Sequence, residues 1–191
     1  HRKTHLLFRK HMKESYKKWL DDIVDCQRPN GQIPCIAPTS LWGYQWGSGV
    51  TWDATLFVIP WNIYHFTGDI SIIERFYPAM ERYLQFLETQ SDNDIFNIGL
   101  GDWNPPLKTV TCDRRALLTC YAKHVFDLFA QMSDLLGYEE KKMYSSRRAT
   151  EIRTAFQNEF LGKHAPCQTY YAALVYFDMV DDKKQAAKGL A

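Results

Sequence analysis

Apolar side chains recur at steps of three and four residues along most of this chain, the spacing that places them on one face of an α-helix. The first such stretch covers residues 5–27, and its other face carries several lysines. Its apolar positions are Phe8, Met12, Tyr16, Trp19, Leu20 and Ile23. The sequence RPNG at 28–31 predicts the end of this helix, because proline and glycine both interrupt helical backbone.

Residues 50–66, VTWDATLFVIPWNIYHF, are apolar on nearly all sides. This composition predicts a helix buried on two faces, which Pro60 ends or kinks locally. Gly68 suits the position after a helix, where a left-handed backbone is common, and Asp69 suits the N-cap of the next helix. That next helix is expected over 70–90.

Three more helices are predicted over 113–136, 139–161 and 167–180, and Gly137 and Gly162 mark the ends of the first two. The inward positions of the second are expected to be Tyr144, Ile152, Phe156 and Phe160. No segment alternates with period two for long enough to predict a strand, so the fold class is all-α. Alternating half-buried and fully buried helices, paired as hairpins, predict two concentric layers.

Both ends of the sequence interrupt this pattern. The first helix has no N-cap before its apolar periodicity begins at about Leu6, and DDKKQAAKGLA starts a further helix that runs out after about two turns. We therefore expect residues 1–191 to be a single segment of a larger helical domain, truncated at both ends. Its inner helices would then need the remainder of the chain, or another subunit, to cover their apolar faces.

Composition excludes some classes of partner. The chain has 46% hydrophobic and 24% charged residues, which is ordinary for a packed domain, and 15% aromatic residues, which is high. A net charge of +1 argues against a nucleic-acid partner. No apolar run approaches the roughly 20 residues that cross a bilayer, so we expect no membrane span.

Metal and cofactor motifs are absent from the sequence. The five cysteines include no C-x-x-C pair, and the six histidines show no zinc spacing. No phosphate-binding loop, dinucleotide fingerprint or G-x-S-x-G elbow is present. We expect no metal and no cofactor. The cysteines are expected to be free, mostly buried thiols, and one structural disulfide stays open as an alternative if the protein is exported.

Two loops concentrate aromatic and acidic residues between the predicted helices: WGYQWGSGVTWD at 42–53 and GLGDWNPP at 99–106. If the hairpins repeat in one direction, both loops open at the same end of the array. An indole offers a large apolar face and one N–H donor, and a neighbouring carboxylate accepts hydrogen bonds from hydroxyl groups. This combination suits a sugar.

The substrate-binding candidates in these loops are Trp52, Asp53, Asp102 and Trp103. Each has a simpler alternative. The tryptophans could belong to the core, as Trp19 and Trp61 are expected to. Asp53 could cap a helix that starts near Ala54, and Asp102 could cap its own turn.

Several runs of the sequence resemble the catalytic domain of bacterial α-L-rhamnosidases, in the same order and at similar separations. They are WLDDIVDCQRPNGQIPCIAPT, GSGVTWDATLFVIPWNIYHFTGD, FYPAMERYLQFLE, GLGDW, YAKHVFDLFAQMSDLLGYEE and IRTAFQNEF. Together they cover nearly the whole chain. The resemblance implies an (α/α)₆ toroid of six helical hairpins with the active site at one mouth, of which this chain would form about half.

The resemblance also implies inverting hydrolysis of terminal rhamnose by two glutamates. The general acid belongs to an Asp-Arg-Asp-Glu type motif upstream of the equivalent of Trp19, and the general base lies downstream of the equivalent of Phe177. Both regions are absent here, so the catalytic residues are expected outside the segment. What carries over is part of the sugar pocket, with Trp52 and Trp103 as stacking platforms and Asp53 and Asp102 as hydroxyl acceptors.

One departure concerns Asp53. Many family members have Trp-Gly-Asp-Ala where this chain has Trp52-Asp53-Ala54, so the carboxylate comes one position early.

The expected function is therefore glycoside hydrolysis by the full-length protein on a rhamnose-containing oligosaccharide or glycoside, with the segment alone inactive. A non-catalytic carbohydrate-binding or scaffold protein is the alternative from another class, and a toroid that acts on another sugar is a third. The family analogy implies a periplasmic or extracellular location.

Overall fold

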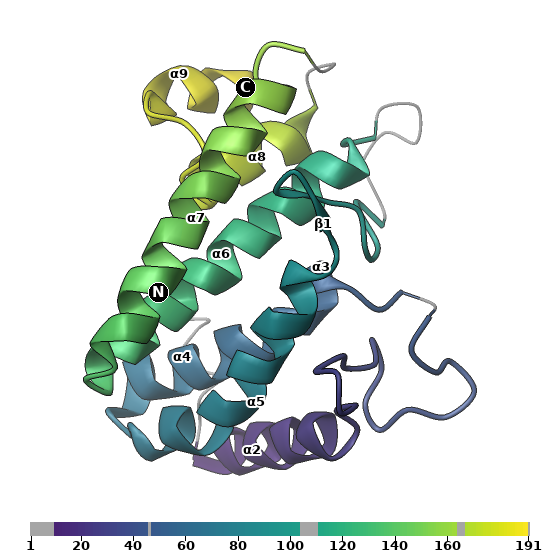
Figure 1. Cartoon of the computed structure of the whole chain (residues 1–191), viewed down its shortest axis with the longest axis vertical. Helices are drawn as coiled ribbons and strands as arrows, with labels where there is room; N and C mark the ends of the chain where they lie inside the picture. Colours follow the sequence, from purple (N-terminus) through teal and green to yellow (C-terminus); the bar gives the residue numbers. More distant parts are fainter. Residues whose placement is uncertain (1–9, 46, 104–110, 164–166, 191) are drawn as a thin grey trace.

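The structure is a computed structural model that describes residues 10–45, 47–103, 111–163 and 167–190 (Figure 1). Predictions for residues 5–9 and 104–106 lie outside these ranges. The helices are α2 (Lys10–Asp25), α3 (Val50–Asp53), α4 (Thr55–Thr67), α5 (Ser71–Glu88), α6 (Arg114–Leu135), α7 (Glu139–Phe160), α8 (Gln168–Tyr176) and α9 (Lys183–Ala187), followed by a 3₁₀ turn at Lys188–Leu190. A two-residue hairpin, β1 (Ser91–Asp92) antiparallel to β2 (Ile95–Phe96), is the sheet structure seen in the described part of the chain. The all-α prediction is confirmed.

The helices form two layers (Figure 1). Helix α4 packs against α6, and α6 packs against α8, to make the inner layer. Helix α5 covers α4 and α6, α7 covers α6, and α2 packs on α4 and α5. The two-layer arrangement expected from alternating half-buried and fully buried helices is confirmed.

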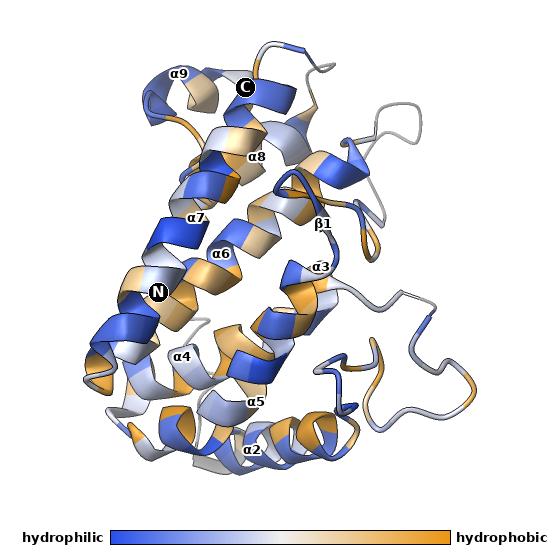
Figure 2. Ribbon diagram, in the orientation of Figure 1, coloured by the Kyte–Doolittle hydropathy of each residue, from blue (hydrophilic) through white to orange (hydrophobic). Residues whose placement is uncertain are grey.

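Helix α6 joins two hydrophobic clusters. The larger cluster lies between α2, α4, α5, α6 and α7, and includes Leu20, Phe57, Met80, Tyr83, Phe126 and Ile152. The smaller cluster lies around the start of α6, the end of α7 and α8, and includes Ala116, Cys120, Phe156, Phe160, Tyr170 and Leu174. Figure 2 shows the hydrophilic face that α7 turns outward. Within the described ranges, no helix is long and apolar enough to span a bilayer.

Local hydrogen bonds explain where the helices begin and end. Gly68 adopts φ = 71° and its N–H donates to the Tyr64 carbonyl, so its predicted place after α4 is confirmed. Asp113 caps α6, because its carboxylate accepts the N–H groups of Arg115 at 2.7 Å and Ala116 at 3.3 Å. The N-cap of α5 is Ile70 and not Asp69 as predicted. The Asp69 carboxylate instead pairs with Lys13 at 2.6 Å while accepting the N–H of Ser71.

Three predictions are corrected by the structure, and a fourth, for Pro60, is narrowed to one of its alternatives. The single helix expected over 50–66 is divided at Ala54 into α3 and α4. Of the two effects expected of Pro60, an end of the helix is not seen, because α4 continues to Thr67 with buried residues on both sides of the proline. Trp19 is 39% exposed and its indole N–H donates to the Ala37 carbonyl at 3.1 Å. Tyr144 is 43% exposed, since its hydroxyl reaches Glu88 at 3.0 Å and not the core.

The long segment between α2 and α3 has no helix or strand over its described residues, yet side-chain hydrogen bonds hold it. The Ser48 hydroxyl donates to the Ile33 carbonyl at 2.7 Å, and the Gln32 amide donates to the Tyr44 carbonyl at 2.8 Å. These bonds fix the approach of the chain to Gly49 and α3.

The loop at 42–53, which we call the first site loop, contacts the loop at 99–106, the second site loop, through the backbone of Gly49 and Gly99. A Cβ on Gly49 would lie 2.2 Å from the Ile98 oxygen and 2.4 Å from the Gly99 Cα, so only glycine allows this approach. The Thr51 hydroxyl adds a hydrogen bond of 2.8 Å to the Leu100 carbonyl. These contacts place the two loops side by side, as expected if both open at the same end of the hairpins.

We predict that Gly49→Ala lowers the free energy of unfolding by about 3 kcal/mol or more, because the methyl group overlaps backbone that cannot yield. Gly137→Ala is the matched control. Gly137 also has a positive φ, of 73°, but a Cβ there meets nothing within 4 Å, so the expected loss is only about 1 kcal/mol of backbone strain. Urea unfolding of both variants compares the two, and equal losses would show that the contact at Gly49 is not tight.

Candidate functional site

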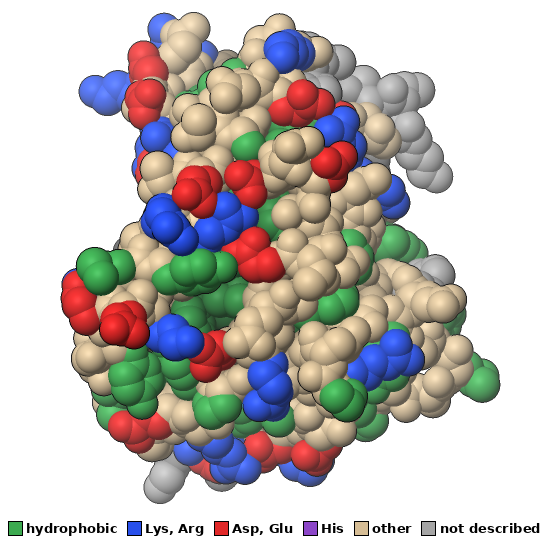
Figure 3. Space-filling model, viewed as in Figure 1, with side chains coloured by type: hydrophobic (Ala, Val, Ile, Leu, Met, Phe, Trp, Pro, Cys, Tyr) green, Lys and Arg blue, Asp and Glu red, His purple; other side chains and the backbone are tan. Residues whose placement is uncertain are grey.

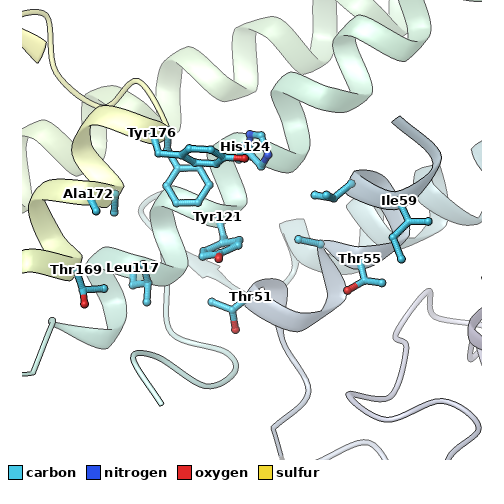
Figure 4. A pocket seen from close by; sticks show the side chains of 13 residues that line it. Thr51, Thr55, Ile59, Leu117, Tyr121, His124, Thr169, Ala172 and Tyr176 are labelled. Carbon is cyan, nitrogen blue, oxygen red and sulfur yellow. The ribbon is translucent and has the colours of Figure 1, made fainter. Parts of the chain in front are cut away.

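The inner helices line a cavity of about 540 Å³, which we call the inner cavity (Figure 4). Its walls come from α3 and α4 on one side, α6 in the middle and α8 on the other. The lining residues are Thr51, Ala54, Thr55, Val58, Ile59, Leu117, Tyr121, His124, Thr169, Ala172, Ala173, Tyr176 and Phe177. In Figure 4 the Tyr121 side chain lies between the residues of α8 and those of α3 and α4.

The polar groups of this cavity are hydroxyls and one imidazole. Burial, with a smaller effect of the Lys123 charge, lowers the pKa of His124 to about 4. The imidazole is therefore neutral at neutral pH, and has one donor and one acceptor nitrogen. None of the described residues that line the cavity is Asp or Glu. Such a wall suits a neutral ligand with several hydroxyl groups.

Asp102 lies at the edge of the inner cavity. Its Oδ2 accepts a hydrogen bond of 2.6 Å from the hydroxyl of Thr169, which lines the cavity. The next residue, Trp103, is 65% exposed, which is unusual for an indole and excludes the core alternative for this residue. The carboxylate and the indole thus stand where the second site loop meets the start of α8.

Trp52 and Asp53 lie on the other side of α3. They line a second cavity of about 230 Å³, the indole cavity, together with Trp19, Cys35 and Ala37 among others. Successive residues of a helix point about 100° apart. Thr51 and Ala54 therefore face the inner cavity while Trp52 and Asp53 do not line it.

The Asp53 carboxyl is buried, and a core residue, Tyr83, is hydrogen-bonded to it. The Tyr83 hydroxyl donates to its Oδ2 at 2.9 Å, while Oδ1 has no hydrogen-bond partner within the described part of the chain. Burial raises the pKa of Asp53 well above its usual value, and the bond from Tyr83 offsets only part of this effect. The alternative role as a helix cap is not seen, because Ala54 precedes α4 without a side-chain cap.

Asp53 and the next residue, Ala54, face different cavities. A carboxylate one position later would replace Ala54, which lines the inner cavity. In this chain the acidic side chain turns instead toward Tyr83 and the indole cavity. Asp53 as a hydroxyl acceptor stays a prediction, as do the sugar-binding roles of Trp52, Asp102 and Trp103.

Comparison with known proteins decides the family. Residues 3–191, nearly the whole chain, match the family described as the bacterial alpha-L-rhamnosidase 6 hairpin glycosidase domain. The chain belongs to this family. The two layers of helical hairpins are therefore part of a six-hairpin glycosidase domain.

Relatives of this six-hairpin domain agree in sequence and in fold. An α-L-rhamnosidase of Formosa agariphila is 26% identical over 185 residues, 91% of this chain and 20% of that protein. The structure of α-L-rhamnosidase from Dictyoglumus thermophilum has a TM-score of 0.83 at 28% identity, over 94% of this chain and 21% of that one. Streptomyces avermitilis α-L-rhamnosidase complexed with L-rhamnose has a TM-score of 0.78 at 27% identity, over 91% and 17% of the two chains. The chain spans about a fifth of the length of the curated relatives it matches.

A third hollow of the six-hairpin segment, the outer groove, lies between α5 and α7. It has a volume of about 380 Å³ and is lined by Leu84, Phe129, Tyr144 and charged residues. Figure 3 shows hydrophobic side chains at the floor of a hollow between α5 and α7, with acidic and basic groups around it. None of the four sugar-binding candidates lines this groove.

Sequence reasoning missed the polar residues that the inner helices contribute. Tyr121, His124 and Thr169 face the inner cavity. Each lies beside buried apolar residues of α6 or α8, where an isolated polar residue is usually satisfied by its surroundings. The position of His124 could have indicated a site, because this polar residue lies next to Tyr121 and Val125 on the helix face that was expected to be buried.

The buried Asp53 carboxyl predicts an unusual pH dependence of stability. The folded protein keeps the proton that the unfolded chain releases near pH 4, so the stability falls as the pH rises above 4 toward the raised folded pKa. Asp53→Asn removes this effect while keeping the shape. We expect the stability of the variant, relative to the original protein, to increase by up to about 1.4 kcal/mol for each pH unit in that window.

Urea unfolding at a series of pH values measures this difference. Asp102→Asn is the control, because its carboxylate is at the surface of the site and pairs with a hydroxyl. A stability difference between Asp53→Asn and the original protein that is the same from pH 4 to pH 8 would contradict a buried neutral carboxyl.

Proposed function

We propose that the complete protein hydrolyses α-L-rhamnosides with inversion, and that this segment supplies part of the sugar pocket. Membership of the six-hairpin rhamnosidase family supports the reaction class. The related protein of Streptomyces avermitilis binds L-rhamnose in its solved structure. Export from the cytoplasm is a further proposal that rests on family analogy alone.

One observation carries the proposal for the pocket: Asp102 is held by Thr169 at the edge of the inner cavity, beside an exposed Trp103. An aromatic face covers the C–H surface of a sugar ring, and a fixed carboxylate accepts its hydroxyl hydrogens. The hydroxyl of Thr169 orients the carboxylate before the sugar arrives. This arrangement provides both contacts at one opening.

Trp52 and Asp53 would close the pocket on the side of the indole cavity. Trp52 is 42% exposed and thus offers indole surface to a ligand. Asp53 keeps one oxygen, Oδ1, that Tyr83 does not use. In this proposal Trp52 is the second stacking platform, and Asp53 accepts a hydroxyl hydrogen only after its buried Oδ1 is opened to the ligand.

The two catalytic carboxyl groups are proposed to lie outside this segment. An inverting glycosidase needs an acid and a base about 6.5–9.5 Å apart with a water molecule between them. The described lining of the inner cavity contains no Asp or Glu. We therefore propose that the segment alone binds sugar weakly and does not hydrolyse it.

The inner cavity also supports a covering partner. Val58 and Ile59 of α4 line it, and Tyr176 of α8 is 72% exposed. Apolar surfaces of this kind are normally covered in a folded protein. We propose that further hairpins of the same protein, or another subunit, complete the wall.

Trp103→Ala in the complete protein should lower kcat/KM on an aryl α-L-rhamnoside by about tenfold or more, because one lost stacking contact costs roughly 1.4 kcal/mol. Trp103→Phe should keep most of the activity. Tyr138→Ala is the control, since Tyr138 is also half exposed but lies beyond the far end of α6. Wild-type kinetics in Trp103→Ala would remove this residue from the site.

The anomeric outcome and the choice of sugar test the reaction. We expect proton NMR of the first turnovers to show the β-anomer of L-rhamnose, as inversion of an α-linkage requires. A panel of aryl glycosides should show hydrolysis of the rhamnoside above other sugars. The α-anomer as first product would contradict inversion. Faster hydrolysis of the glycoside of another sugar would replace rhamnose as the proposed substrate. No hydrolysis of any glycoside would favour a carbohydrate-binding protein.

A further inference from the structure

Two ion-paired bridges join α5 to α7 at the outer groove. The Lys141 ammonium is paired with Glu81, and the Arg148 guanidinium is paired with Glu88 at 2.8 Å. The two acids lie seven residues apart on α5, and so do the two bases on α7. Seven helical residues rise about 10 Å. The bridges therefore delimit a short opening between the two helices.

The floor of this opening is apolar. Leu84 of α5 is 5% exposed and Phe129 of α6 is 2% exposed, and both line the outer groove. Figure 3 shows hydrophobic side chains at the bottom of the hollow between α5 and α7. The volume of about 380 Å³ is larger than that of one aromatic ring, so a ring fits on this floor.

One polar group in this apolar region has no partner. Ser145 lines the outer groove from α7, and its side chain is fully buried. Its hydroxyl forms no hydrogen bond with the part of the chain that the structure describes. Such a group destabilises a fold, because it loses its hydrogen bonds to water and gains none. A buried, unpaired hydroxyl in the wall of a hollow points to a ligand that pairs with it.

The charge of the rim indicates which ligand. Three glutamates and one lysine line the outer groove. Lys141 and the neighbouring Arg148 are both paired with carboxylates, so neither is available to an anion. Glu140 also lines the groove, but it is exposed and forms no ion pair within the described ranges. The uncompensated charge is negative and favours a cation.

We propose that the outer groove binds a small organic cation, an ammonium ion carried by an apolar ring. The ring rests on Leu84 and Phe129. The ammonium lies toward the Glu140 carboxylate and donates an N–H to the Ser145 oxygen. Because the two bridges delimit the groove along both helices, it takes a small molecule and not an extended peptide.

Entry of this ligand requires a local displacement, because the Ser145 oxygen is covered in the free groove. Gln85 and Tyr144 line the groove and are both exposed, so their side chains can turn aside without loss of core packing. None of the proposed sugar-binding residues lines the groove. The proposal therefore stands whether or not the complete protein hydrolyses rhamnosides.

Three probes of similar size test the charge of the ligand: phenethylammonium, 2-phenylethanol and phenylacetate. Each is titrated into the complete protein by calorimetry, with L-rhamnose present in excess to occupy the proposed sugar pocket. We expect phenethylammonium to bind with a dissociation constant of roughly 1 mM. The alcohol should bind about fivefold more weakly or less, and the carboxylate should not bind. Equal binding of the ammonium ion and the alcohol would overturn the proposal, and so would no binding of the ammonium ion.

Variants locate the site. Glu140→Gln removes the unbalanced charge and Ser145→Ala removes the hydroxyl, so each should weaken the binding of phenethylammonium by about three- to tenfold. Glu159→Gln is the control for charge, since Glu159 lies at the far end of α7 and pairs with Arg115 at 3.1 Å. Ser146→Ala is the control for the hydroxyl, since Ser146 is exposed. Both controls should bind the probe as the original protein does. Unchanged binding in Glu140→Gln or in Ser145→Ala would contradict the site.

Ser145→Ala also has an expected effect in the absence of ligand. Its urea midpoint should be higher than that of Ser146→Ala. Both variants replace serine by alanine in the same helix, but only the first removes a buried hydroxyl without a partner. A midpoint equal to or below that of Ser146→Ala would show that the Ser145 hydroxyl is not left unpaired in the folded protein, and the ligand contact would lose its basis.

Discussion

The backbone contact between Gly49 and Gly99 determines how the two site loops are arranged. Neither position has room for a Cβ against the other strand of chain, and the Thr51 hydroxyl bonds to Leu100 beside them. This contact brings α3 and its Trp52 to the same end of the hairpins as Asp102 and Trp103. The rim of the inner cavity depends on it, since Thr51 lines the cavity and Asp102 is held at its edge by Thr169.

The outer and inner helices behind this rim differ in how many of their faces are apolar. Helix α7 buries one face and exposes the other, as an outer helix should. Helix α4 is apolar all round but buries mainly one side, and its Val58 and Ile59 face the inner cavity. A helix of this composition is stable only if something apolar or a ligand covers its second face. The six-hairpin family supplies the physical reason, because its inner helices face one another across the toroid.

Periodicity was enough to predict the helices, their layers and the terminating Gly68, because burial of apolar faces dominates where long helices lie. It could not predict the break at Ala54, or that Asp53 is buried against the Tyr83 hydroxyl of a helix distant in sequence. The exposure of Trp19 also escaped prediction, since it depends on a hydrogen bond to the distant Ala37 carbonyl. Thr169 gave no signal, because its role is defined only by its partner Asp102.

The central claim is that the two joined loops form one opening that accepts rhamnose. A crystal structure of the complete protein with L-rhamnose tests it most directly. The account predicts a sugar ring stacked on Trp103 with a hydroxyl bonded to the Asp102 carboxylate, and Trp52 on the same side of the toroid. A rhamnose bound elsewhere, with Trp103 and Asp102 both away from it, would contradict the account.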